Sequence, residues 1–228
     1  MRDRMLRSPL VLGGQVFPTR KAARDAARRI LHYYWPGEIV RDQAHHQFHV
    51  DLVYLHSSGV EKIGVGISHF EVRHNLFSTT GFWLVRTDGT ATDFSYLKCI
   101  SPPTHRAQVT AALRRAIDDQ ILEFRNQALS EGPVLCPVYN IPLTTNNSEV
   151  DHAAPLTFKR LSELLVDMFG GWDAIELQPE RDGVLGDKLA DWKVEWQWQD
   201  FHMARANLRL VSRAANQGPL RIREPRRG

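Results

Sequence analysis

The chain is poor in cysteine, with Cys99 and Cys136 as the only two among its 228 residues. Two cysteines cannot build the multiple disulfides that stabilise small secreted domains, and they cannot supply a zinc site made of four cysteines. The scarcity of cysteine therefore predicts a protein of the reducing cytoplasm that contains no structural zinc.

Long hydrophobic runs and an excess of one charge are also missing. No apolar stretch is long enough to span a membrane, and the basic residues 1–7 are not followed by the apolar core of a signal peptide. The 29 basic residues nearly balance the 26 acidic ones, for a formal net charge of +3. These absences predict no membrane partner and leave local clusters of arginine as the feature that indicates nucleic acid.

The remaining composition, with 43% hydrophobic residues, is sufficient for one good core or two small ones. The order of the expected elements predicts an α+β protein in three parts. We expect residues 1–102 to form a small α+β domain with an antiparallel sheet, and residues 103–131 to form a connecting helix. Residues 132–228 would form a second domain that contains a helical insertion.

The N-terminal part begins with a predicted helix. Thr19 precedes a run in which apolar residues such as Ala23 and Ile30 recur at helical spacing, so we expect Thr19 to cap this helix. Asp88-Gly89 stands between two strand-like runs and is typical of a hairpin turn. The strand-like runs of this part cover residues 48–55, 63–72, 81–86 and 90–96.

Arginines recur every four residues along the predicted helix and therefore share one face. Arginine forms bidentate contacts with phosphate, so this face fits a nucleic-acid backbone, with an ordinary solvated face as the alternative. The three arginines are Arg20, Arg24 and Arg28.

Three nearby histidines, His45, His46 and His49, resemble a small metal cluster. They have no Cys or acidic partner at a spacing known for metal ligands. The pattern therefore favours surface or packing roles for them.

Several segments of this part resemble the DeCL domain, over roughly residues 15 to 100. The domain takes its name from the plant protein Defective Chloroplasts and Leaves, which is implicated in plastid ribosomal RNA maturation. The resemblance implies association with nucleic acid and supplies no catalytic residues. The segments that carry it are residues 17–23, 61–67, 88–89 and 93–100.

The C-terminal part contains the pair Asp151-His152 and, further on, Asn207 and Asn216. Asp-His-x-x-Pro is preceded here by Cys-Pro-x-x-x-x-Pro-Leu, and the two asparagines stand nine residues apart. Together these segments resemble the two halves of the HNH, or ββα-metal, endonuclease motif in its HNN variant. The resemblance implies that Asp151 and His152 end a β-hairpin and that both asparagines lie on the helix beneath it.

The resemblance also implies a role for each of these residues. Asp151 and Asn216 would be metal ligands, His152 the general base on water, and Asn207 the residue that orients His152. Phosphodiester hydrolysis needs a deprotonated water, a Lewis acid and a stabilised leaving oxygen, which one histidine and one cation can supply. Carboxylate and amide oxygens suit Mg²⁺, or Mn²⁺, better than zinc.

The chain departs from compact HNH domains in two ways. It lacks the Cys-x-x-Cys pairs that bind a structural zinc in many of them, and residues 153–206 are inserted between His152 and Asn207. Within this insertion, residues 156–169 carry apolar side chains at helical spacing and end at Gly170-Gly171. This pattern predicts an amphipathic helix.

An aromatic cluster follows within the same insertion. Core packing is its commoner use, and stacking on unpaired bases is the alternative. His202, just behind it, fits either a packing role or an approach to the active site. The cluster consists of Trp192, Trp196, Trp198 and Phe201.

A second set of arginines, Arg205, Arg209 and Arg213, recurs at four-residue spacing beside the helix expected to bind the metal. Basic side chains there would draw a phosphate backbone toward the cation. The arginines therefore fit the nucleic-acid-binding role that the resemblance implies.

These patterns predict a cytoplasmic, Mg²⁺-dependent endonuclease that hydrolyses double-stranded DNA, with the N-terminal part helping to bind the substrate. The family alone implies a restriction, defence or phage setting. An RNA-directed nuclease, which the DeCL resemblance favours, and a nucleic-acid-binding protein that no longer cuts are the alternatives. Because a single HNH site cuts one strand at a time, a duplex break implies a homodimer or two visits.

Overall fold

The structure is a computed structural model that describes residues 9–75, 79–178 and 187–220. The chain divides into two compact units, of which the first runs to Thr104 and the second begins at His105. The two units are described separately below.

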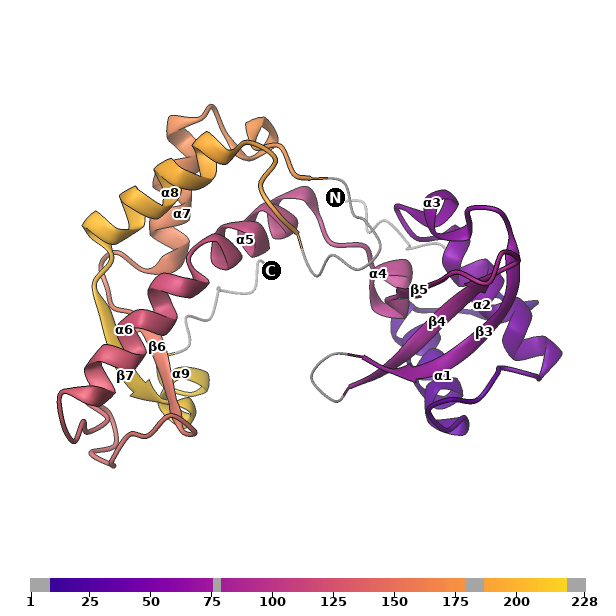
Figure 1. The fold of residues 1–228 in the computed structure, drawn as a ribbon, viewed down its shortest axis with the longest axis horizontal. Coiled ribbons are helices and arrows are strands. Elements are labelled where there is room, and N and C mark those ends of the chain that lie inside the picture. Colours follow the sequence, from indigo (N-terminus) through magenta and orange to yellow (C-terminus); the bar gives the residue numbers. More distant parts are fainter. Residues whose placement is uncertain (1–8, 76–78, 179–186, 221–228) are drawn as a thin grey trace, which may run out of the picture. The chain divides into compact units, whose positions relative to one another are not determined.

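The N-terminal unit combines helices with two small antiparallel sheets (Figure 1). One sheet pairs β1 with β2, and the other has the strand order β3-β4-β5. This arrangement confirms the α+β class. The elements are β1 (Leu10–Leu12), β2 (Gln15–Phe17), α1 (Arg20–Tyr33), α2 (Gln43–Tyr54), α3 (Gly59–Ile63), β3 (Ile67–His74), β4 (Thr80–Arg86), β5 (Ala91–Phe94) and α4 (Tyr96–Ile100).

Local signals specify the predicted helix and the predicted hairpin correctly. Thr19 caps α1, because its Oγ1 accepts a hydrogen bond from the backbone N–H of Ala22 at 3.1 Å. Asp88 and Gly89 form the turn between β4 and β5, with Gly89 at a φ of 84°. Oδ1 of Asp88 accepts a hydrogen bond from the N–H of Thr90 at 2.9 Å, which holds the turn.

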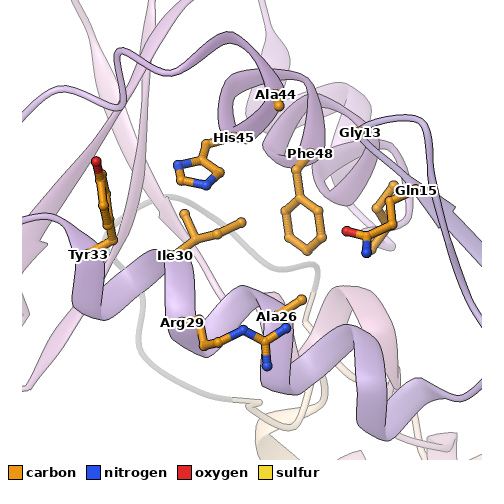
Figure 2. A pocket seen from close by; sticks show the side chains of 10 residues that line it. Gly13, Gln15, Ala26, Arg29, Ile30, Tyr33, Ala44, His45 and Phe48 are labelled. Atoms are coloured by element: carbon orange, nitrogen blue, oxygen red, sulfur yellow. The ribbon is translucent and has the colours of Figure 1, made fainter.

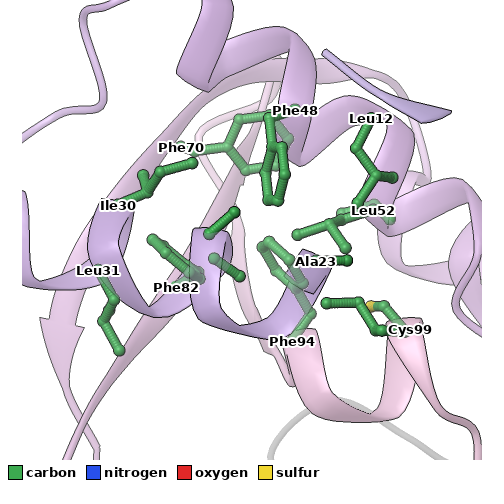
Figure 3. Close-up of a cluster of buried hydrophobic side chains, with 14 of the residues drawn as sticks. Leu12, Ala23, Ile30, Leu31, Phe48, Leu52, Phe70, Phe82, Phe94 and Cys99 are labelled. Atoms are coloured by element: carbon green, nitrogen blue, oxygen red, sulfur yellow. The ribbon is translucent and has the colours of Figure 1, made fainter. Parts of the chain in front are cut away.

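The core of this unit lies between the three-stranded sheet and helices α1 and α2 (Figure 3). Phe70, Phe82 and Phe94, on three adjacent strands, are directed into it because the register places them on one face of the sheet. The small residues Ala23 and Ala27 of α1 are fully buried and allow the helix to pack closely. One continuous apolar layer therefore holds the unit together.

The strand predicted over residues 48–55 is wrong, because this segment belongs to helix α2. Oδ1 of Asp42 accepts a hydrogen bond from the N–H of His45 at 2.9 Å and caps the helix. Phe48, Leu52 and Val53 then fall on one buried helical face. The cap and the helical spacing outweigh the strand propensity of the β-branched and aromatic residues.

The C-terminal unit consists of a helical part and a small ribbon of two strands with a helix (Figure 1). Apolar side chains of α5, α7 and α8 form one core, and a second apolar cluster lies beneath the paired strands β6 and β7. The elements are α5 (His105–Ala116), α6 (Asp118–Ser130), β6 (Ser148–His152), α7 (Phe158–Met168), a 3₁₀ helix (Trp172–Ala174), α8 (Trp192–Arg205), β7 (Leu208–Ser212) and α9 (Arg213–Gln217).

The single connecting helix predicted over residues 103–131 is instead two helices that belong to the second unit. The helix is interrupted at Ile117, which has a non-helical φ of −113° and a buried side chain. Asp118 and Asp119 then favour a new helix start, because their negative charges interact well with a helix N-terminus. The segment is therefore part of a core rather than a joint.

The insertion between β6 and β7 supplies helices α7 and α8. The predicted amphipathic helix is confirmed as α7, which ends before Gly170. Trp198 of α8 is fully buried and donates a hydrogen bond from Nε1 to the carbonyl of Leu113 at 2.7 Å, whereas Trp192 and Trp196 are exposed. Across the described ranges, no helix is both long and apolar enough to cross a membrane.

Candidate active site

Strands β6 and β7 and helix α9 form one strand–strand–helix unit (Figure 1). The strands are antiparallel, and their register places Asp151 opposite Arg209. Ser212 ends β7 and also caps α9, because its Oγ accepts a hydrogen bond from the N–H of Ala215 at 3.2 Å. One serine therefore connects the second strand to the helix without a loop.

Three of the predicted site residues, Asp151, His152 and Asn216, line one open cavity of about 500 Å³. Strand β6 contributes the first two and α9 the third, so the packing of the helix on the strands brings together residues that are far apart in sequence. The rest of the lining comes from α5, from the start of α7 and from the neighbours of these residues. It consists of Arg114, Val150, Thr157, Phe158, Lys159, Gln217 and Leu220.

Asn207 is not among the residues that line this cavity, and its predicted position on the helix is wrong. It immediately precedes β7, with an exposed side chain. Its backbone carbonyl accepts a hydrogen bond from the N–H of Ala153 at 2.8 Å, which extends the strand pairing by one residue beyond His152. The backbone of Asn207 therefore fixes the chain beside His152, and Asn216 alone of the two lies on a helix.

His152 contacts a second histidine that the sequence left with two possible roles. Nε2 of His152 lies 2.8 Å from Nε2 of His202, which is buried on α8. Nδ1 of His202 lies 2.6 Å from Oε1 of Gln120 on α6. His202 therefore approaches the candidate site from α8, and its other ring nitrogen contacts Gln120 of α6.

The surroundings keep both imidazoles neutral near pH 7. Burial lowers the pKa of His152, the positive charge of Arg114 lowers it further, and the negative charge of Asp151 acts in the opposite direction. Burial, with a smaller effect of His152, lowers the pKa of His202 to about 4. A neutral imidazole is the form that can accept a proton, so His152 is in the state that a general base requires.

Asp151 and Asn216 each have one oxygen that makes no hydrogen bond to a described residue. Nε and Nη2 of Arg209 bind Oδ2 of Asp151 at 2.8 and 2.7 Å, while Oδ1 makes no hydrogen bond to any described residue. Nδ2 of Asn216 donates a hydrogen bond to Oε2 of Glu149 at 2.6 Å, which leaves the amide oxygen as the remaining polar atom of that side chain. Arg209 and Glu149 therefore fix how the two side chains are oriented.

This donor set fits a hard divalent cation. A carboxylate and an amide oxygen are ligands that Mg²⁺ and Mn²⁺ accept, and two protein ligands leave positions for water and phosphate. Within the part of the chain that the structure describes, no group of three or more His, Cys, Asp and Glu side chains is arranged to hold a metal. Carboxylate and amide oxygens suit such a hard cation better than zinc, which is commonly bound by nitrogen and sulfur.

Basic residues that the sequence did not indicate also border the cavity. Arg114 of α5 lies with its guanidinium 4.1 Å from the ring centroid of Phe158, and Lys159 lines the same cavity from α7. The sequence indicated no function for Arg114, within the predicted connecting helix. Helix α5 reaches the cavity only through tertiary packing, and no spacing rule along the chain could have predicted this.

The arginines predicted beside the metal helix do not share a helical face. Arg205 ends α8, Arg209 lies in β7 and Arg213 begins α9, so their four-residue spacing crosses three elements. The guanidinium of Arg205 stacks over Phe201 at 4.3 Å, and Nε of Arg213 pairs with Glu149 at 3.1 Å. Arg209 and Arg213 thus pair with carboxylates of β6, which a helical interpretation did not anticipate.

The arginines of α1 differ in their surroundings. Arg20 is half-buried and donates a hydrogen bond from Nη1 to the carbonyl of Ile100, whereas Arg24 and Arg28 are exposed. Arg20 therefore has a structural partner within its own unit. A phosphate-binding face on this helix stays a prediction, with Arg24 and Arg28 as its exposed members.

A second cavity, of about 340 Å³, lies in the N-terminal unit beside the β1–β2 hairpin. Arg29 and Ile30 of α1 face His45 and Phe48 of α2 across it (Figure 2). Nδ1 of His45 lies 2.9 Å from the hydroxyl of Tyr34, so this ring nitrogen has a hydrogen-bond partner within the unit. Apolar side chains and a few polar groups line this cavity together.

The neighbouring histidines have packing roles, as the sequence favoured. His49 is fully buried among Phe70, Phe82 and Phe94, and its Nδ1 lies 2.6 Å from the carbonyl of His45. The ring of His46 packs against Phe70 with 5.2 Å between centroids. These contacts explain the three histidines without a metal.

Comparison with known proteins supports the resemblance of the N-terminal part. Residues 28–100 match a family described as "Protein of unknown function (DUF3223)". The chain is also similar to "Protein EMBRYO DEFECTIVE 514" of Arabidopsis thaliana, with 39% identity over 94 residues. That match covers 40% of this chain and 46% of the plant protein, so the chain spans less than half the length of this relative.

A solved structure is similar over a comparable share of the chain. It is the solution NMR structure of an uncharacterized protein from Rhodospirillum rubrum, with 36% sequence identity and a TM-score of 0.38. The match covers 40% of this chain and 88% of that protein.

Proposed function

We propose that the C-terminal unit is a Mg²⁺-dependent endonuclease of the HNN type that hydrolyses phosphodiester bonds of DNA. One observation carries the proposal: Asp151, His152 and Asn216 line the same cavity. They lie on the first of two paired strands and on the helix that follows the second. Two paired strands followed by a helix are the elements that the ββα-metal resemblance implies, although Asp151 and His152 end the first strand rather than a hairpin and Asn207 precedes the second. Support therefore comes from the residue types and from their position on the fold.

Each residue of the site has a chemical task under this proposal. Asp151 and Asn216 would hold the cation, which when bound supplies Lewis-acid stabilisation of the phosphoryl group and of the leaving oxygen. His152 is neutral and borders the cavity, so it can take a proton from water. Arg114 borders the same cavity and provides positive charge for a phosphate.

The N-terminal unit would contribute substrate binding. Its resemblance to the DeCL domain and the exposed Arg24 and Arg28 on α1 support contact with a nucleic-acid backbone. Both cysteines are free thiols, which supports a reducing compartment such as the cytoplasm. A restriction, defence or phage setting, and a homodimer that cuts both strands, follow from the family resemblance alone.

A nuclease that acts on RNA is the second candidate function. The observation that favours it is the N-terminal resemblance to a domain whose namesake is implicated in RNA maturation. The same cavity would serve, because the phosphodiester chemistry is shared. Duplex DNA and structured RNA of matched length, offered with Mg²⁺, distinguish the two substrates. A non-cleaving nucleic-acid-binding protein would bind either substrate and cut neither.

The central experiment incubates the purified protein with supercoiled plasmid and Mg²⁺. Nicked or linear product is expected from the native protein, and none from His152→Ala or after addition of a chelator. DNA affinity should stay nearly unchanged in His152→Ala, because this side chain acts on water. His32→Ala is the matched control, since His32 is exposed and lies in the N-terminal unit. Cutting retained by His152→Ala would overturn the proposal, and cutting of RNA alone would select the second candidate.

A further inference from the structure

Gln120 has a defined amide orientation. Its Nε2 donates a hydrogen bond to the backbone carbonyl of Gln199 at 3.0 Å, and a carbonyl oxygen can only accept. Oε1 of Gln120 therefore faces His202 and must accept the hydrogen bond from Nδ1 of that ring, at 2.6 Å. Consequently His202 carries its proton on Nδ1.

The protonation of His202 determines that of His152. A neutral imidazole has one N–H and one lone pair, so Nε2 of His202 is unprotonated and can only accept. Nε2 of His152, 2.8 Å away, must then be the donor. The opposite tautomer of His152 would bring two lone pairs to this distance, which is unfavourable in a buried site.

The donor role of Nε2 leaves Nδ1 of His152 with the free lone pair. Among the described residues, none forms a hydrogen bond with this nitrogen, and the ring borders the cavity shared with Asp151 and Asn216. His202 is buried, and its pKa of about 4 keeps it neutral over the range in which the enzyme would work. The hydrogen-bond chain therefore stays in one state.

We infer that His202, oriented by Gln120, is a positioning residue that holds His152 in the tautomer whose Nδ1 accepts the proton of the attacking water. The inference rests on the proposed nuclease function. In the reaction, an O–H bond of water breaks and its proton goes to Nδ1, a P–O bond forms, and the bond from phosphorus to the leaving oxygen breaks. Solvent water protonates the leaving oxygen, and Nε2–H of His152 remains bound to His202 throughout.

The hydrogen bonds around Gln120 connect three helices. Gln199 of α8, which accepts from Gln120, donates its own Nε2 to the carbonyl of Ala116 at 2.7 Å. His202 lies less than one turn further along α8. These bonds connect the ends of α5 and α6 to α8, so the acceptor for His152 is held by the core of the unit.

A kinetic experiment compares two variants of His202 in the full chain. His202→Leu removes the acceptor and should lower kcat by about 10- to 100-fold with little change in DNA affinity. His202→Gln keeps one acceptor for His152 and one donor for Gln120, and it should restore most of the lost rate. If His202 only fills space in the core, leucine should replace it better than glutamine. A kcat retained by His202→Leu but lost in His202→Gln would therefore overturn the inference.

NMR of the metal-free native protein, with ¹⁵N-labelled histidine, tests the tautomer without any cleavage. The expected signature at pH 7 is a protonated Nε2 and an unprotonated Nδ1 on His152, assigned by comparison with His152→Ala. A proton on Nδ1 of His152 would overturn the inference even if the protein cuts DNA. Absence of cleavage by the native protein would instead overturn the proposed function, so the two failures are distinguishable.

Discussion

The carboxylate of Asp151 and the guanidinium of Arg209 face each other across the β6–β7 ladder, with Nη2 of Arg209 2.7 Å from Oδ2 of Asp151. Under the proposed function this pair has two opposite effects on a cation. The hydrogen bonds fix the orientation of the carboxylate, while the positive charge of Arg209 competes with the cation for it.

We expect the positive charge of Arg209 to affect cation affinity more than its orienting hydrogen bonds do. Arg209→Met is expected to bind Mn²⁺ more tightly than the native protein does, because it removes a positive charge beside a proposed ligand. Calorimetric titration with Mn²⁺ measures this directly. Arg205→Met is the matched control, since Arg205 ends α8 and stacks over Phe201. Weaker Mn²⁺ binding by Arg209→Met would show that orientation of the carboxylate matters more than charge.

The acid limb of the cleavage rate should lie below pH 6.5, the ordinary pKa of histidine. His152 must be neutral to act as a base, and burial together with the charge of Arg114 lowers its pKa. The rate should therefore rise as the pH increases through this lowered pKa and be level near pH 7. The measurement is kcat at saturating DNA across the acid range.

Arg114→Gln should move this limb to higher pH, because the nearby positive charge is lost. Arg115→Gln, next along the same helix, controls for the change in net charge. A limb that does not move in Arg114→Gln would contradict the electrostatic role of Arg114 at His152.

Local signals predicted much of the fold. Three features could be predicted because each depends on a few neighbouring residues: the cap at Thr19, the turn at Asp88-Gly89 and the helix end at Gly170. Residues 48–55 were assigned wrongly because their apolar pattern fits a strand as well as a helix, and the cap at Asp42 decided between them.

The candidate site depends only in part on signals that are local in sequence. Asp151, His152 and Asn216 were identified by motif, and the structure brings them to one cavity, although their roles stay predictions. Gln120 and Arg114 reach the site from helices that precede it in sequence by tens of residues. Their contribution depends on helix packing, which no local spacing encodes.

Acid should destabilise the N-terminal unit through His49. This ring is fully buried, and burial lowers its pKa from 6.5 to about 4. Below pH 6.5 the unfolded chain binds a proton that the folded unit does not, so stability falls as the pH decreases from 6.5 to about 4 and then levels off. At about 1.36 kcal/mol per pKa unit, the loss due to His49 amounts to roughly 3 kcal/mol.

Urea unfolding of the native protein and of His49→Leu at several pH values measures this loss. The difference in unfolding free energy between them should shrink or reverse toward pH 4, since leucine cannot be protonated. His32→Leu, at an exposed position, should follow the native pH dependence. A pH-independent difference between native protein and His49→Leu would contradict the assignment to His49.

The salt dependence of DNA binding tests the arginine face of α1. Arg24→Ala combined with Arg28→Ala removes the two exposed arginines and leaves Arg20 with its structural partner. If both contact phosphates, the slope of log affinity against log salt should flatten by about one unit per lost contact. Fluorescence anisotropy with labelled duplex DNA over a range of salt concentrations gives this slope.

A matched double variant separates the face from net charge. Arg41→Ala with Arg160→Ala removes the same two positive charges at exposed positions outside α1. Its slope should stay close to that of the native protein, because displacement of counterions depends on phosphates neutralised rather than on total charge. If the slope flattens equally in both double variants, the effect is due to net charge. If it is unchanged in both, the arginines of α1 form a solvated face that does not contact DNA.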